Sequence, residues 1–98
     1  MKPSHDLKIA LTPENPFWQG ISYQYGIGVR RNPEEAVMWY TRAAEAGNVE
    51  SMLNLAYCYA NGTGVREDMK AYVSWLKSAA ARGSVKATSL LNMHHGRM

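Results

Sequence analysis

A pattern of glycine, valine and tryptophan occurs twice in this chain. Gly62-Thr63-Gly64-Val65 is followed by Trp75, and Gly26-Ile27-Gly28-Val29 is followed by Trp39. The second glycines and the tryptophans of the two copies both differ by 36 in residue number. Self-similarity at a fixed period of this length is typical of stacked repeat units, so the pattern constrains the fold more than any other feature.

Composition limits the remaining choices. The 98 residues are enough for one small domain. No apolar run is long enough to span a membrane, and the first residues lack the apolar core of a signal peptide. The single cysteine, Cys58, cannot form an internal disulfide, which fits a reducing compartment. These features favour a cytoplasmic protein, unless a leader peptide was removed.

The net charge of +3 is unevenly distributed. From Met69 to Met98 there are five Lys or Arg residues and no Asp or Glu. This basic C-terminal third is either a solvated helical face or a patch for an acidic partner. We favour the solvated face.

The first expected helix covers residues 13–25. Thr12-Pro13-Glu14 offers a capping hydroxyl, a proline at the first helical position and an acid near the positive helix end. Pro16 complicates this start because it removes a regular backbone hydrogen bond. The alternative is a helix capped by Asn15 that begins at Pro16.

Four further helices are expected at 33–46, 49–60, 69–82 and 85–95. Asn32 and Pro33 begin the second, and Glu35 completes a capping box. Residues 49–60 are apolar nearly all round, as in a helix packed on more than one side. Asp68 and Ser84 cap the last two.

The glycine segments between the helices should reverse the chain, because glycine adopts positive φ readily. Val29 is expected to turn inward after the first of them. The prediction is therefore an all-α, right-handed α/α solenoid of antiparallel helix pairs. Its parts are an N-terminal extension, 1–11, that caps the first repeat or frays, a single repeat domain, 12–95, and a tail, 96–98. The domain comprises repeat one, 12–47, repeat two, 48–83, and a partial third repeat, 84–95.

The spacing of small and aromatic residues resembles the Sel-one-like repeat (SLR) family. The second copy reads Leu55-Ala56-x-x-Tyr59-x-x-Gly62-x-Gly64-Val65, then Ala71-Tyr72-x-x-Trp75 and Ala79-Ala80-x-x-Gly83. This family is a subclass of α/α repeats related to the tetratricopeptide repeat. The resemblance implies a bacterial, non-catalytic protein that assembles complexes as a scaffold or adaptor. The residues that carry the repeat are Gly26, Gly28, Trp39, Gly47, Gly62, Gly64, Trp75 and Gly83.

Both ends depart from the family pattern. Gln19 stands where the second copy has Leu55, and Asn92 stands where it has Ala56. Two and a half units are close to the smallest stable array. We therefore expect a cap by residues 1–11, self-association into a homo-oligomer, or a protein partner at an open end.

Stacked helical arrays present a concave surface formed mainly by the first helix of each unit. Positions on these helices that lie off the core-facing stripe and recur every 36 residues form a candidate groove for a peptide or helix. Some of them could equally be core residues. The candidates are Trp18, Ile21, Ser22, Asn54, Tyr57, Cys58, Leu90, Met93 and His94.

No residue set points to catalysis, a metal or a cofactor. Trp39 and Trp75 fit inter-helix packing, and Cys58 fits a small hydrophobe because no basic residue is near it in sequence. His94 and His95 lie at a helix end, with only His5 as a further histidine. Our hypothesis is a non-catalytic interaction module that binds a protein partner through its groove or end face, for example a small bacterial regulator, inhibitor or immunity protein. The alternative is binding of nucleic acid or an acidic partner through the basic third, and we do not favour nucleic acid.

Overall fold

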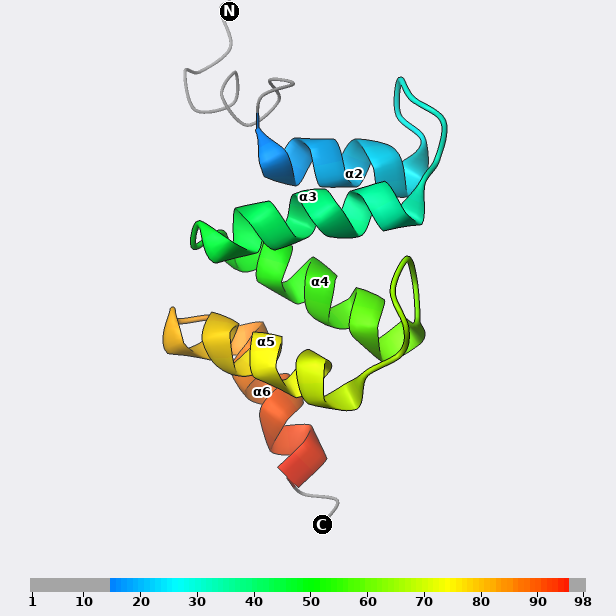
Figure 1. Cartoon of the computed structure of the whole chain (residues 1–98). Coiled ribbons are helices and arrows are strands. Elements are labelled where there is room, and N and C mark those ends of the chain that lie inside the picture. Colours follow the sequence, from blue (N-terminus) through cyan, green and yellow to red (C-terminus); the bar gives the residue numbers. More distant parts are fainter. Residues whose placement is uncertain (1–14, 96–98) are drawn as a thin grey trace, which may run out of the picture.

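The computed structural model describes residues 15–95, and these residues form a row of stacked helices (Figure 1). Within them every regular element is an α-helix, which confirms the all-α prediction. The expected cap by residues 1–11, the Thr12 cap and the tail 96–98 lie outside the described residues. The helices are α2 (Pro16–Tyr25), α3 (Pro33–Glu45), α4 (Val49–Asn61), α5 (Met69–Ala81) and α6 (Val85–His95).

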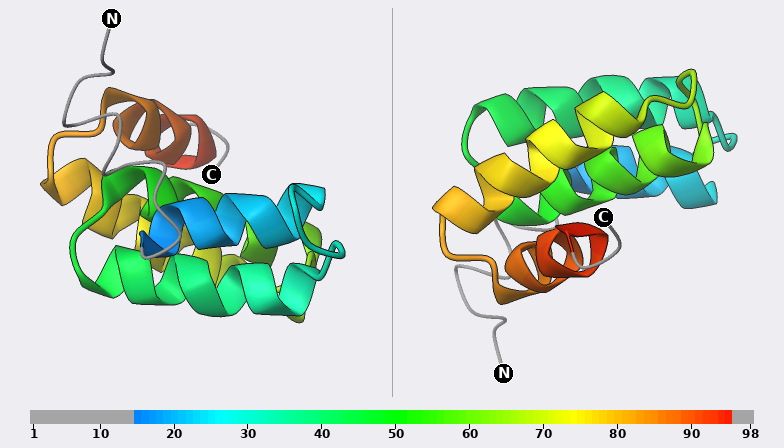
Figure 2. Two further views of the ribbon diagram at one scale, coloured as in Figure 1. Left: turned by 90° about the horizontal axis from the view of Figure 1, so that it is seen from above. Right: turned by 90° about the horizontal axis from the view of Figure 1, so that it is seen from below.

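Each helix packs against its neighbours in the chain, α2 on α3, α3 on α4, α4 on α5 and α5 on α6. Seen along the stack, α3 and α5 lie on one side and α2, α4 and α6 on the other (Figure 2). We call α2, α4 and α6 the first-helix layer, because each opens a repeat unit. Because the repeat units stack in these two layers, side chains that are 36 residues apart lie at equivalent positions of successive units.

Polar side chains cap the helix starts. Asn15 accepts hydrogen bonds from the backbone N–H groups of Phe17 and Trp18, so α2 begins at Pro16, the second of the two predicted starts. The cap of α3 is half of the predicted box. Asn32 accepts from the Glu35 N–H at 3.2 Å, but its own N–H donates to the Tyr23 carbonyl at 2.8 Å. That bond closes the loop onto α2 and leaves no role for the Glu35 carboxylate in a box.

The two glycine loops have the same backbone. Gly26 and Gly62 have φ of 71° and 70°, and Gly28 and Gly64 have φ of 74° and 72°. These values lie in the left-handed region that favours glycine. The 36-residue period therefore holds at the level of single dihedral angles.

The surroundings of these loops differ. A Cβ added at Gly64 would collide with the Pro33 carbonyl on α3, whereas a Cβ added at Gly28 would meet nothing within 4 Å. Val65 accordingly packs against the core, but Val29 is 38% exposed. The prediction that Val29 turns inward is wrong. Val65 sits beside the helix of the preceding repeat, and no described helix stands in that place for Val29.

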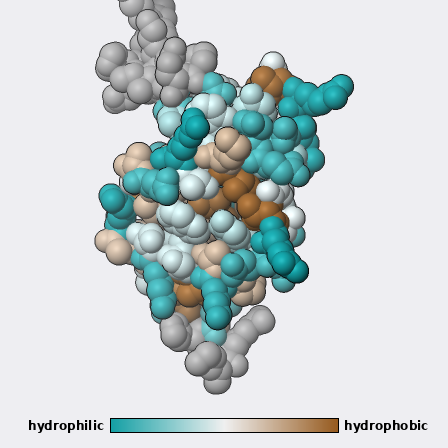
Figure 3. Space-filling view, viewed as in Figure 1, coloured by the Kyte–Doolittle hydropathy of each residue, from teal (hydrophilic) through white to brown (hydrophobic). Residues whose placement is uncertain are grey.

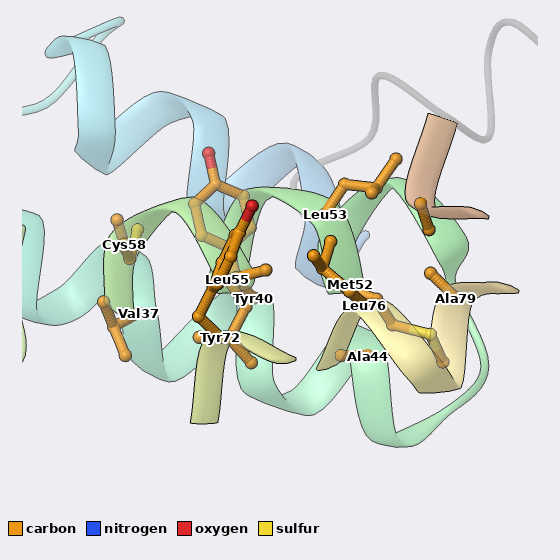
Figure 4. Packing of buried hydrophobic residues seen from close by; sticks show 13 residues of the cluster. Val37, Tyr40, Ala44, Met52, Leu53, Leu55, Cys58, Tyr72, Leu76 and Ala79 are labelled. Atoms are coloured by element: carbon orange, nitrogen blue, oxygen red, sulfur yellow. The ribbon is translucent and has the colours of Figure 1, made fainter. Parts of the chain in front are cut away.

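The core lies between the layers and is centred on Tyr40, Leu55 and Leu76, which are fully buried. Figure 4 shows side chains of α3, α4 and α5 converging there. Tyr40 requires space on α2, because a Cβ at Gly20 would overlap its ring. In the second repeat the equivalent positions hold Ala56 and Leu76, so a larger residue on one helix is matched by a smaller one on its partner.

Candidate partner-binding surface

The nine candidate positions all lie on the first-helix layer, three on each helix. Seven of them reach the surface. Met93 is 57% exposed, and the rest are half-buried. The seven are Trp18 and Ile21 on α2, Asn54 and Tyr57 on α4, and Leu90, Met93 and His94 on α6.

Ser22 and Cys58 do not belong to this surface. They are only 7% and 3% exposed, and Cys58 is part of the core cluster. Ser22 comes one residue after the outward-facing Ile21, and Cys58 comes one residue after the outward-facing Tyr57. Because successive side chains of an α-helix are rotated by about 100° around its axis, Ser22 and Cys58 point toward the neighbouring helix. Burial raises the pKa of the Cys58 thiol, which fits the inert hydrophobe predicted from sequence.

His94 occupies the same repeat position as Ser22 and Cys58, and it joins two helices. Its Nε2 lies 3.0 Å from the Tyr72 hydroxyl on α5, and the two rings meet edge to face with centroids 5.3 Å apart. Tyr72 is only 5% exposed. This contact fixes α6 on α5. The His94 side chain, predicted as a partner contact, therefore also serves to pack two helices of the chain together. The side chain of His95 lies outside the described atoms.

A second tyrosine links α3 to the first-helix layer. The Tyr40 hydroxyl donates a hydrogen bond to the Gln24 Oε1 on α2. Burial is the largest cause that raises the pKa of Tyr40, Cys58 and Tyr25 add to it, and a hydrogen bond with Asn54 opposes it. The sequence pattern did not reveal this polar contact. The sequence did contain a signal that the two repeats differ here. The first repeat pairs a tyrosine with a glycine at the positions where the second repeat pairs a leucine with an alanine.

Tyr57 and Lys86 bring α4 and α6 together at the surface. The Lys86 ammonium lies 5.6 Å from the centroid of the Tyr57 ring, within the range of a cation–π contact. Tyr57 and Leu90 also pack against the core cluster. Around Tyr57, the first-helix layer thus combines apolar side chains with one cation.

The two tryptophans of the repeat pattern were predicted as packing residues. Trp75 packs against the core cluster. Trp39 is half-buried, and the Arg42 guanidinium carbon lies 4.9 Å from its ring centroid. Its Nε1 is buried without a hydrogen-bond partner among the described residues. Packing is therefore clear for Trp75, while Trp39 also carries a cation–π contact.

The opposite side of the molecule is formed by α3 and α5. Figure 3 views the side of α3 and α5 and shows a central apolar area, with smaller apolar areas near the upper and lower ends, among polar side chains. The basic residues of the last two helices are not gathered in one place. Lys70 and Lys77, seven residues apart, share one exposed stripe of α5, whereas Lys86 lies over Tyr57 in the first-helix layer.

Residues 15–95 contain no group of three or more His, Cys, Asp or Glu that could hold a metal ion. No helix in the described part of the chain is long and apolar enough to cross a membrane.

Comparisons with known proteins agree with this geometry. A family model described as Sel1 repeat matches residues 20–48 and 49–84. A Sel1 repeat protein from Oxalobacter formigenes has a similar structure, with a TM-score of 0.75 and 35% identity over 80% of this chain. Cysteine rich protein B of Helicobacter pylori has a TM-score of 0.72 and 27% identity over 76% of this chain.

A third similar structure is c5321, described as a protective antigen of uropathogenic Escherichia coli strains with an SLR fold. It has a TM-score of 0.74 and 28% identity over 85% of this chain. The present chain spans 23%, 56% and 18% of the lengths of these three proteins, in the order given. No curated protein matches it.

Proposed function

Because the chain belongs to the Sel1 repeat family, we propose that it binds a segment of a partner protein on its first-helix layer. Proteins built from Sel1 repeats are generally protein–protein interaction modules, and the family generally provides non-enzymatic scaffolds. In this proposal the helices form a rigid support, apolar side chains supply most of the binding energy, and charges set specificity.

One observation carries the proposal. Apolar and aromatic side chains recur at outward positions of successive first helices, Ile21 on α2, Tyr57 on α4 and Met93 on α6. A second row runs beside them with Trp18, Asn54 and Leu90. Since equivalent positions in a stack are one repeat apart, a bound segment would meet anchors at regular intervals.

The C-terminal end of the stack is a poorer candidate. Ser89 and Asn92 on α6 are exposed, and the internal repeat buries Leu53 and Ala56 at the equivalent positions. A polar outer face is typical of a capping unit, because stacking another helix on it would desolvate polar groups. This favours the first-helix layer over self-association through α6.

The test uses a peptide selected from a displayed random library for binding to the whole chain. Met93→Ala should lower the affinity for the peptide about tenfold, which corresponds to truncating one partly buried anchor. Met38→Ala is the matched control, because Met38 is exposed to a similar degree, 51%, but lies on α3. Circular dichroism should show unchanged helicity in both variants. Equal affinities of the two variants for every selected peptide would refute the proposed surface.

We also propose a biological setting for the chain. The three similar structures come from, or are described in, bacteria, which supports a small bacterial adaptor, regulator or inhibitor. Cys58 is buried and forms no disulfide, which supports a reducing, cytoplasmic location.

A further inference from the structure

We propose that the partner segment presents an acidic residue next to an apolar anchor and that α6 receives both. This inference rests on the proposed binding of a protein segment to the first-helix layer, and it specifies the chemistry of that segment. The acceptor is one face of α6 together with Tyr57 of α4. Three residues of α6, Lys86, Leu90 and Met93, share that face because they follow each other at spacings of four and three.

Among residues 15–95, Lys86 is a cation without an acidic partner. It is exposed, it rests on the Tyr57 ring, and no ion pair involves it within the described part of the chain. No Asp or Glu occurs after Asp68 in the sequence, so α5 and α6 supply no competing carboxylate. The Tyr72 hydroxyl and the His94 imidazole, on α5 and α6, form a hydrogen bond with each other. A carboxylate from a partner would therefore find an available ammonium group.

The apolar part of the acceptor lies directly beside this cation. Leu90 and Tyr57 are half-buried against the core, so a partner would meet side chains that are already held in place. Met93 is 57% exposed and extends the surface by one helical turn. Pre-positioned side chains lose little entropy on binding, and a flexible methionine adapts to different anchors.

The preceding repeat has the opposite charge at the equivalent place. Glu50 on α4 stands 36 residues before Lys86, and it is also exposed. By the repeat symmetry, the position of Glu50 relative to Ile21 of α2 corresponds to the position of Lys86 relative to Tyr57 of α4. A segment that runs along the layer would then meet a cation at α6 and an anion at α4. Opposite charges at equivalent positions give the bound segment a defined direction.

The experiment is a pair of selections from one library of displayed random peptides. One selection uses the natural chain and the other uses Lys86→Glu. Peptides selected on the natural chain should be enriched in Asp or Glu beside an aromatic or aliphatic residue, and the Lys86→Glu chain should replace this enrichment with Lys or Arg. The best natural-chain peptide should bind Lys86→Glu about tenfold more weakly, with a smaller loss at high salt. Lys77→Glu, an exposed lysine on α5, is the matched control and should retain the affinity.

The outcomes separate this inference from the proposed function. If selected peptides depend on Tyr57 and Met93 but their charge does not follow residue 86, the acidic-partner inference is wrong and the binding surface stands. If the selected peptides depend on neither Tyr57 nor Met93, both fail. Displacement of the peptide by a single-stranded oligonucleotide would assign Lys86 to nucleic-acid binding instead, and association of the chain with itself through this face would assign it to a second copy. Either result overturns the inference.

Discussion

Gly28 and Gly64 allow the contribution of inter-repeat packing to be measured with a matched pair of substitutions. Both have φ close to 73°, at 74° and 72°, and both sit at the same place in the glycine loop. Replacing either with alanine puts a Cβ into a left-handed residue, which costs about 1–2 kcal/mol. Because this backbone term is common to both, it cancels in the difference between the two variants.

What remains is the contact that only Gly64 makes. Its added Cβ would collide with the Pro33 carbonyl and lie 3.0 Å from Val37 Cγ2, so the loop must move away from α3. That movement uncovers Val65, which now packs on the core. Burying a valine side chain fully is worth roughly 1.5–3 kcal/mol, so partial loss costs about 1–2 kcal/mol. We expect Gly64→Ala to destabilise the chain by about 2–4 kcal/mol and Gly28→Ala by about 1–2 kcal/mol.

The measurement is urea unfolding followed by circular dichroism, with both variants and the natural chain fitted to a common m-value. Stability losses that agree within about 0.5 kcal/mol would refute the reasoning, because additive sites are reproducible to about that level. Such a result would mean that the second loop does not press on α3 in solution.

Two other predictions concern Tyr40. Gly20→Ala should destabilise the chain by about 1–3 kcal/mol, because the added methyl overlaps the Tyr40 ring. Adding Tyr40→Leu should cost less in this background than in the natural chain, and a double-mutant cycle in urea would reveal the coupling, whereas strict additivity would count against the overlap. The folded state raises the pKa of Tyr40 above its ordinary value of 10.0, chiefly through burial. The corresponding stability should be complete below about pH 10 and should decline as the pH rises further. Tyr40→Phe should remove that part of the decline, as measured by the midpoint of thermal unfolding at several alkaline pH values.

The local features of the fold could be predicted from the sequence because they depend on neighbouring residues. The helix boundaries agree to within one residue for α3, α4, α5 and α6, since capping side chains and glycines act over one turn. The period of 36 predicts the two glycine loops, whose dihedral angles agree closely. At α2 the sequence left two starts open, and the Asn15 side chain accepts hydrogen bonds that select the second.

Burial is decided by what covers a residue, and the tertiary structure supplies that information. Val29 and Val65 have the same place in the repeat, yet only Val65 packs on the core, because only its loop lies against a preceding described helix. Ser22 and Cys58 were predicted as surface candidates, but both are buried. Each lies one residue after an outward-facing residue, and this step around the helix directs its side chain inward. His94 occupies the equivalent repeat position on α6. Its side chain contacts Tyr72, which lies 22 residues earlier in the chain. The period in the sequence therefore determined which positions are equivalent, and the helices packed around each position decided which of the equivalent residues are exposed to a partner.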